Sequence, residues 1–452
     1  MRQKRESVLS LRWNDEGLPL PVRVYRAKYQ AISQVLDRSP EILNRIHDDL
    51  RKLSQGGRRG REGDYTSENI LRALLVQSIE GLSFRDVVVR IAESAFLQDF
   101  LRMRKKTVMD YSFLNKCFKA IRPETWKAVN KLLSQDAVRR DLIDAATIRT
   151  DTTVVETNIH YPTDSSLLWD AWRVASRWLR RARKIEPACC RHRFHNRKIK
   201  RLYLFIARYA ISKSKPRQRQ VKAAFRALIE RVEWIVGIAG EFCDVARSSS
   251  NLDLAGVGLE LQAFLPSMRT VAATARRAQV VGETVPARDR VFSIFEPHTE
   301  LLKRGKRQKP TEFGHKVLLC ETPEKFITDY EVYERQQADC ALTESVIRRH
   351  EALFGVAPKV LAGDMGFCPT AEKFEELEEL VGTLAIPRRL RDFANKVLAK
   401  WQAFRAGIEG TISGLKRVFR LFRCFFRGFK SFASAVGLGV FCHNLIVLAG
   451  SS

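Results

Sequence analysis

Two acidic residues stand out because of where the sequence places them. Asp151 interrupts a run of β-branched residues at 146–155, and Asp364 follows the short apolar run 359–363. Such runs predict buried strands, so each carboxylate would lie on a strand or at its end. Carboxylates that face one another need a compensating cation, and such oxygen ligands suit Mg²⁺. Taken singly, Asp151 could instead face solvent from an edge strand, and Asp364 could cap a turn.

A third acid, Glu409, lies in a basic and apolar segment that predicts a helix. Arg405 precedes it by four residues and Lys416 follows it by seven. On an α-helix these three side chains project within roughly 40° of one another. Apolar residues repeat at helical spacing on the neighbouring stripe, namely Ile408, Ile412, Leu415, Phe419 and Phe422. The helix would therefore bury one face and present a carboxylate between two cations, although an exposed ladder of ion pairs has the same spacing.

Three glycines in this segment, Gly407, Gly410 and Gly414, weaken the predicted helix. Each costs up to about 1 kcal/mol relative to alanine. Close approach of a sheet or of DNA would explain them, and local fraying is the alternative.

Together the three acids resemble the catalytic triad of the DDE transposases of bacterial insertion sequences. The segment Asp151–Asp164, which ends in Tyr-Pro-Thr-Asp, also resembles the first-acid segment of that family. In many members the last acid lies in a Tyr-x2-Arg-x3-Glu-x6-Lys pattern. This chain has Arg405, Glu409 and Lys416 at that spacing, with Gln402 in place of the tyrosine.

The resemblance implies an RNase H-like core that cleaves insertion-sequence ends and transfers the strands. It implies two Mg²⁺ ions, replaceable by Mn²⁺, with Asp151 bridging them and with Asp364 and Glu409 each serving mainly one. Arg405 and Lys416 would neutralise phosphate or orient DNA. The alternative is a catalytically inactive DNA-binding protein of transposase descent, which the glutamine at 402 favours weakly. Four rival acids also lie near predicted strands or turns: Glu156, Asp164, Asp329 and Asp339.

The charge balance points to a polyanionic partner. The 452 residues include 79 Lys and Arg against 51 Asp and Glu, a net charge of +28. Residues 173–231 hold 20 Lys and Arg and two acids, a local balance of +18. This block predicts basic helices with aromatic residues in their core and cations that face phosphate, although a solvated charged face is the usual alternative. Its candidate DNA contacts are Arg180, Arg181, Arg183 and Lys184.

A second group of candidate DNA contacts lies in the basic loop 303–309 and comprises Lys303, Arg304, Lys306 and Arg307. Flexible cations there could lie on a DNA backbone, and an exposed hairpin tip is the alternative.

The order of predicted elements favours an α/β fold in three parts. Residues 1–140 predict an N-terminal helical region for DNA-end binding or dimerisation, with helices at Val24–Leu53, 66–77, 84–95, 111–121 and 123–133. Residues 141–165 and 289–452 predict the catalytic domain, an RNase H-like mixed sheet with flanking helices, in which 290–295 would be a strand. Residues 166–288 predict a basic helical insertion. The expected partner is double-stranded DNA, both element ends and target, bound by a homodimer or larger assembly.

The remaining features predict a cytoplasmic protein with no membrane partner. The charged start lacks the apolar stretch of a signal peptide, and the apolar run 435–450 is too short to span a bilayer. Cys189, Cys190, His192 and His195 could be read as zinc ligands, but they lack the usual finger spacing, so incidental thiols fit better.

Overall fold

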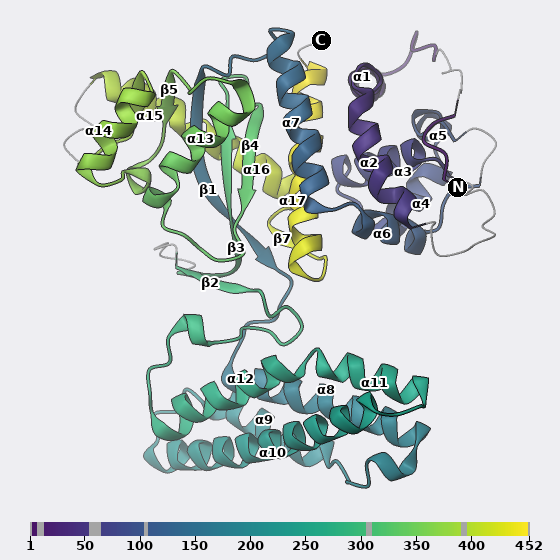
Figure 1. Ribbon diagram of the computed structural model, residues 1–452, viewed down its shortest axis with the longest axis vertical. Helices are drawn as coiled ribbons and strands as arrows, with labels where there is room; N and C mark the ends of the chain where they lie inside the picture. Colours follow the sequence, from purple (N-terminus) through teal and green to yellow (C-terminus); the bar gives the residue numbers. More distant parts are fainter. Residues whose placement is uncertain are drawn as a thin grey trace. The chain divides into compact units, whose positions relative to one another are not determined.

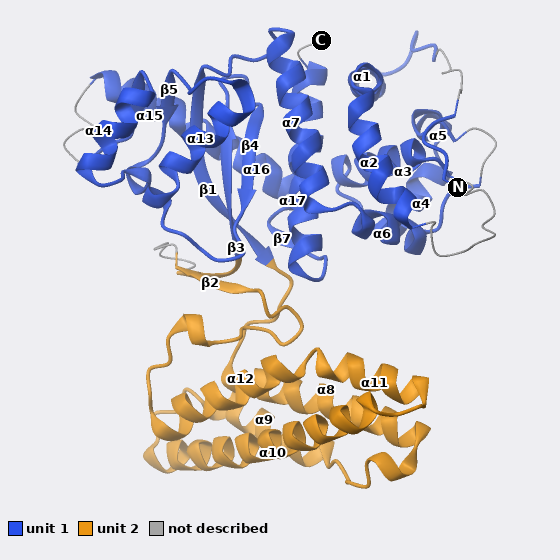
Figure 2. Ribbon diagram, in the orientation of Figure 1, with its two compact units in different colours: residues 1–156, 315–452 blue, residues 157–314 orange. Residues whose placement is uncertain are grey.

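The computed structural model describes residues 2–6, 13–53, 65–103, 107–303, 310–389 and 396–450. It divides into two compact units (Figure 2). Unit 1 consists of Met1–Glu156 and His315–Ser452, and unit 2 of Thr157–Gly314. The division into three functional parts predicted from the sequence is a separate proposal, which these two units do not test.

Unit 1 begins with a helical region (Figure 1). Its helices are α1 (Leu20–Arg38), α2 (Pro40–Lys52), α3 (Ser67–Ile79), α4 (Phe84–Ala92), α5 (Ala95–Phe100), α6 (Tyr111–Ala120) and α7 (Pro123–Arg139). The single helix expected at Val24–Leu53 is wrong, because Pro40 starts a second helix and proline at an interior position breaks the helical hydrogen-bond ladder. Thr66 caps α3 through a reciprocal pair of hydrogen bonds with Asn69, as the sequence predicts.

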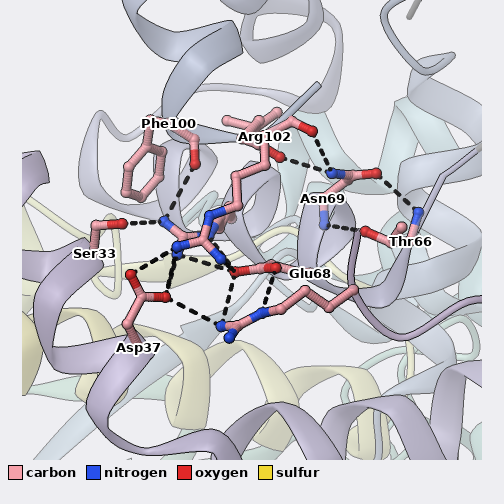
Figure 3. A network of polar contacts seen from close by, with 10 residues as sticks. Ser33, Asp37, Thr66, Glu68, Asn69, Phe100 and Arg102 are labelled. Atoms are coloured by element: carbon pink, nitrogen blue, oxygen red, sulfur yellow. Dashed lines mark hydrogen bonds and ion pairs between the residues drawn. The ribbon is translucent and has the colours of Figure 1, made fainter. Parts of the chain in front are cut away.

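A buried polar network holds these helices together (Figure 3). The guanidinium of Arg72 on α3 lies 3.1 Å from Glu68 and 3.2 Å from Asp37. It also donates hydrogen bonds to the hydroxyl of Ser33 and to the carbonyl of Phe100. Burial lowers the pKa of Arg72 to about 10. The network therefore links α1, α3 and α5 through one charged side chain whose partners offset its desolvation.

A seven-stranded mixed sheet follows. Its strands are β1 (Thr147–Thr157), β2 (Glu300–Lys303), β3 (Thr311–Glu321), β4 (Ile327–Val332), β5 (Val360–Ala362), β6 (Thr383–Ala385) and β7 (Arg423–Cys424). The order is β2-β3-β1-β5-β6, with β4 paired to β3 and β7 to β1. Strands β1, β5 and β6 run parallel, whereas β3 is antiparallel to β2 and β4. The mixed α/β fold predicted from the sequence is confirmed.

The sheet separates two apolar cores, because successive side chains of a strand point to opposite faces. On β3, Leu318 belongs to a core with α13 (Thr343–Phe354) and α14 (Ala371–Leu380). Its neighbours Val317 and Leu319 belong to the core that includes α7 and α17 (Phe429–Gly450). Helix α17 is long and apolar enough to cross a membrane, but 78% of its most apolar window is buried inside the protein, as in a core helix. The last two helices are α15 (Lys396–Ala406) and α16 (Ile408–Arg417).

Unit 2 is built on five helices: α8 (Asp164–Ile185), α9 (Asn196–Tyr209), α10 (Lys215–Arg247), α11 (Leu252–Gln262) and α12 (Leu265–Arg276). The strand expected at 290–295 is wrong: Ile294 is buried in the helical core and Phe295 contacts Phe264. Packing on helices thus takes the place of strand pairing for these apolar residues. Lys303 is the exposed last residue of β2, while Arg304, Lys306 and Arg307 lie outside the described residues.

Candidate active site

Parallel pairing of β1 with β5 brings Asp151 and Asp364 to the same end of the sheet. Strands β1 and β5 are parallel and pair Thr147 with Val360 and Arg149 with Ala362. Asp151 lies two residues further along β1, and Asp364 lies two residues beyond the end of β5. Adjacent strands lie about 4.8 Å apart, so the register brings these two acids to neighbouring positions where β5 ends. The side chain of Asp151 is only 15% exposed, which excludes the solvent-facing position that an edge strand would give it.

Asp364 caps a short turn as well as lying at a strand end. Its Oδ1 accepts a hydrogen bond of 2.9 Å from the backbone amide of Gly366, and it is the cap of the 3-10 turn Met365–Phe367. A Cβ at Gly366 would lie 3.0 Å from Oδ1 of Asp364 and 3.8 Å from Oδ2 of Asp339. Asp339 therefore lies beside Asp364, and the absence of a side chain at Gly366 leaves room between the two carboxylates.

Asp339 is the residue that sequence reasoning undervalued. It begins the 3-10 turn Asp339–Ala341, ahead of α13. Its Oδ1 accepts hydrogen bonds from Thr152 Oγ1 at 3.2 Å and from Lys316 Nζ at 2.8 Å. Thr152 directly follows Asp151 on β1, but successive side chains of a strand point to opposite faces, so these contacts place Asp339 beside Asp364 and not beside Asp151. No local sequence motif distinguishes Asp339 from the other rival acids, so its position is evident only in the folded chain.

Arg405 connects the third acid to the first. Its Nη1 lies 3.2 Å from Asp151 Oδ2 and 3.5 Å from Glu409 Oε1. The Arg405 side chain is 19% exposed and that of Glu409 is 67% exposed. An exposed i, i+4 ladder alone would not reach a strand, so this arginine does more than stabilise its own helix. It holds one positive charge between two of the three predicted catalytic carboxylates.

Gln402 fastens α15 to the end of the sheet. Its side-chain amide donates hydrogen bonds to the carbonyls of Gly363 at 2.9 Å and of Ala385 at 3.1 Å. These carbonyls end β5 and β6, and an amide nitrogen has the two hydrogens that satisfying both requires. Glutamine at this position is therefore a structural anchor for the helix that carries Arg405.

A buried ion pair fastens α16 to the sheet as well. Arg149 on β1 donates a 2.6 Å hydrogen bond to Glu321 on β3 and a 2.8 Å hydrogen bond to the carbonyl of Phe404. Glu321 also accepts a hydrogen bond from the hydroxyl of Thr411 on α16. Both charged side chains are buried. Burial raises the pKa of the Glu321 carboxyl, and the hydrogen bonds from Arg149 and Thr411 oppose that rise.

The glycines of this segment differ in their surroundings. A Cβ at Gly407, between α15 and α16, would lie 2.2 Å from Nη1 of Arg149, whereas nothing lies within 4 Å of a Cβ at Gly410 or Gly414. Close approach of a side chain from the sheet therefore requires glycine at 407.

We expect Gly407→Ala to lower the free energy of unfolding by about 1–3 kcal/mol, the usual cost of overpacking. Gly410→Ala and Gly414→Ala are matched controls and should each raise it by up to about 1 kcal/mol through helix propensity. Urea unfolding of the three full-length variants measures the difference. Equal shifts in all three would mean that the contact with Arg149 does not require glycine.

The donor chemistry of the predicted triad fits a hard divalent cation, since Asp151, Asp364 and Glu409 offer only carboxylate oxygens. Among the residues that the structure describes, no three His, Cys, Asp or Glu side chains already have the spacing of metal ligands. This applies to Cys189, Cys190, His192 and His195 as well, all of which are described.

The other predicted contacts lie on helices. Lys416 is in the last turn of α16. Arg180, Arg181, Arg183 and Lys184 all lie on α8 of unit 2, where Arg181 and Lys184 are exposed and Arg180 and Arg183 are half-buried.

Two regions of the chain match known protein families. Residues 24–120 match the family described as "Transposase domain (DUF772)", and residues 297–445 match the "Transposase DDE domain". Together the two matches span more than half of the chain. The chain belongs to the DDE transposases. No curated protein and no solved structure matches it.

Membership places the mixed sheet in the RNase H-like core of DDE transposases. It also accounts for the helical region before the sheet, because the first match covers α2–α6 and most of α1. Transposases of this family act on DNA and use divalent metal ions. The second match includes Asp364 and Glu409, but Asp151 lies outside both matches, so its assignment depends on the strand register and on Arg405.

Proposed function

We propose that this transposase cleaves the ends of an insertion sequence and transfers the strands, with Asp151, Asp364 and Glu409 as catalytic metal ligands. The observation that carries the proposal is the convergence of the three acids. Parallel pairing of β1 with β5 brings Asp151 and Asp364 to the same end of the sheet, and Arg405 joins Asp151 to Glu409. Three distant parts of the chain thus supply carboxylates to one end of a parallel strand pair.

The three carboxylates would hold two Mg²⁺ ions, or Mn²⁺ in their place. When bound, such ions lower the pKa of an attacking water or 3′-hydroxyl and stabilise the leaving 3′ oxygen. Asp151, at the centre of the cluster, would bridge them. Arg405 neutralises Asp151 and Glu409 in this structure, and with DNA present it could turn to a phosphate.

We further propose that the protein works as a homodimer or larger assembly on double-stranded element ends and target DNA in the cytoplasm. In this proposal residues 1–140 bind the ends or dimerise, residues 141–165 and 289–452 catalyse, and residues 166–288 are a basic insertion. Lys416, Lys303, Arg304, Lys306 and Arg307 would add contacts to phosphates.

The test is metal dependence of cleavage at saturating DNA binding. Purified protein is mixed with labelled duplexes that carry the inverted repeats flanking its coding region, and nicking at the repeat boundary is followed with Mg²⁺, Mn²⁺ or EDTA. We expect cleavage with either metal and none with EDTA. Tight binding without cleavage under all three conditions would instead establish the inactive DNA-binding protein of transposase descent.

A further inference from the structure

The basic helices of unit 2 carry their positive charge without internal neutralisation. From Arg177 to Arg231 no Lys or Arg side chain forms an ion pair, in a stretch that the structure describes completely. The ion pairs that flank this stretch are those of Arg173 with Asp170 and of Arg276 with Glu233. Unneutralised charge of one sign destabilises a compact domain through self-repulsion, which binding of a polyanion would relieve.

Some of these cationic side chains line a cavity. The cavity has a volume of about 910 Å³ and lies between the C-terminal half of α8, the loop after it and the first turns of α9. No acidic side chain lines it. Its six cationic lining residues, called here the cationic pocket, are Arg180, Arg183, Arg193, Arg197, Lys198 and Arg201.

The pocket is built on a fixed aromatic base. The indole Nε1 of the buried Trp172 on α8 donates a 3.0 Å hydrogen bond to Asn196, the first residue of α9. Phe194, which lines the pocket, contacts Trp172 and Trp234 with ring centroids 6.4 Å and 6.0 Å apart. Arg183 donates a hydrogen bond to the carbonyl of His192 in the connecting loop. The cations of the pocket therefore lie on packed helices and on a loop that is hydrogen-bonded to α8.

The backbone adds to the positive potential. Helix α9 begins at the pocket, its cap residue His195 makes no side-chain capping hydrogen bond, and its first turn contains no acid. The amino end of a helix carries a partial positive charge and unsatisfied N–H groups. An anion in the pocket would complement both the side chains and this helix end.

We propose that the cationic pocket binds consecutive phosphates of one DNA strand and concentrates there the DNA affinity of the basic block. This inference rests on the proposed function and names the place where unit 2 meets the substrate. A single phosphate group carries about two negative charges, too few for six cations. A DNA strand supplies a series of phosphates at regular spacing, which suits a row of cations contributed by α8, the loop after it and α9.

Two full-length variants with the same change in charge test the proposal. The pocket variant carries Arg180→Gln, Arg193→Gln, Arg197→Gln and Arg201→Gln. The control variant carries Lys200→Gln, Lys213→Gln, Arg219→Gln and Lys222→Gln, four exposed cations of unit 2 that lie outside this cavity. Binding of each protein to one non-specific duplex is measured across a series of salt concentrations.

We expect the slope of log K against log salt to fall in the pocket variant by roughly 0.9 for each phosphate contact removed. The control variant should keep the wild-type slope to within about one contact. Equal changes in the two variants would overturn the proposal, because a uniformly charged face predicts them. An unchanged slope in the pocket variant, with its thermal unfolding intact, would also overturn it.

A further arm separates DNA from small phosphate compounds. Inorganic tripolyphosphate is added at matched ionic strength, and thermal unfolding is recorded for the wild type and for both variants. A stabilisation that only the pocket variant loses, while its DNA binding is unchanged, would reassign the pocket to free polyphosphate and contradict the proposal. Failure of the proposed catalysis would be recognised separately, as wild-type protein that binds DNA with a normal salt slope but does not cut it.

Discussion

Asp151→Asn, Asp364→Asn and Glu409→Gln should each lower the rate of DNA cleavage by about 10³-fold or more. Metal ions supply several kcal/mol of charge stabilisation in the transition state, and the loss of about 4 kcal/mol corresponds to a factor of about 10³. An amide keeps the shape of the carboxylate but removes its charge, so folding and DNA binding should change little. Single-turnover cleavage of a labelled element end, with DNA affinity measured in parallel, gives both quantities.

The matched control is Glu376→Gln, an exposed acid on α14, which should leave cleavage unchanged. Asp339→Asn is informative because Asp339 lies beside Asp364 and is paired with Lys316. A smaller loss than in the three triad variants would make it a positioning residue. Full turnover in any one of the triad variants would remove that residue from the catalytic set.

Arg149→Met should destabilise unit 1 by about 3–5 kcal/mol, the usual cost of leaving one partner of a buried ion pair uncompensated. Glu321 would then remain buried without its cation, and the carbonyl of Phe404 would lose its donor. The midpoint of urea unfolding and hydrogen exchange of residues 396–417 report the effect. We expect α15 and α16 to lose protection first, because Arg149 links both helices to the sheet.

The pH dependence gives this prediction a sign. Burial raises the pKa of Glu321, so the folded state tolerates its protonated form better than its ionised form. The contribution of a group with a raised pKa is fully present below its unfolded pKa and is lost as pH rises through the folded value. Removal of Arg149 removes a cation that opposes this rise, so the destabilisation by Arg149→Met should shrink as pH falls through the raised pKa of Glu321 towards the usual carboxyl range.

Replacement of both partners is the control for this experiment. Arg149→Met combined with Glu321→Met removes the unpaired charge and should recover much of the lost stability, as hydrophobic replacements of buried pairs often do. A double variant as unstable as the single one would show that lost packing, and not the buried charge, accounts for the effect.

Sequence patterns predicted those parts of the fold whose causes are local. The helices predicted at 66–77 and 111–121, and the strands around Asp151 and before Asp364, follow from short-range periodicity and turn chemistry. The break between α1 and α2 was also readable, because Pro40 cannot continue a helix. Local reasoning gave the wrong result at 290–295, where β-branched and aromatic residues pack on helices and tertiary context overrides strand propensity.

The features that position the site could not be read from the sequence. Nothing local pairs Arg149 with Glu321, 172 residues away, or directs the Gln402 amide to two carbonyls at strand ends. The same holds for Asp339, which lies beside Asp364 only because of the turn before α13. Each of these depends on strand order, a long-range property that spacing patterns do not encode.

The proposal that Asp151 is a metal ligand in the reaction is tested most directly by Asp151→Cys and the ratio of its cleavage rates in Mn²⁺ and Mg²⁺. Thiolate is a poor ligand for Mg²⁺, whereas softer transition metals accept it better. The wild type should cleave element ends with either ion, and the variant should cleave with Mn²⁺ while remaining inactive with Mg²⁺. A ratio equal to that of the wild type would contradict a direct contact between residue 151 and the catalytic metal.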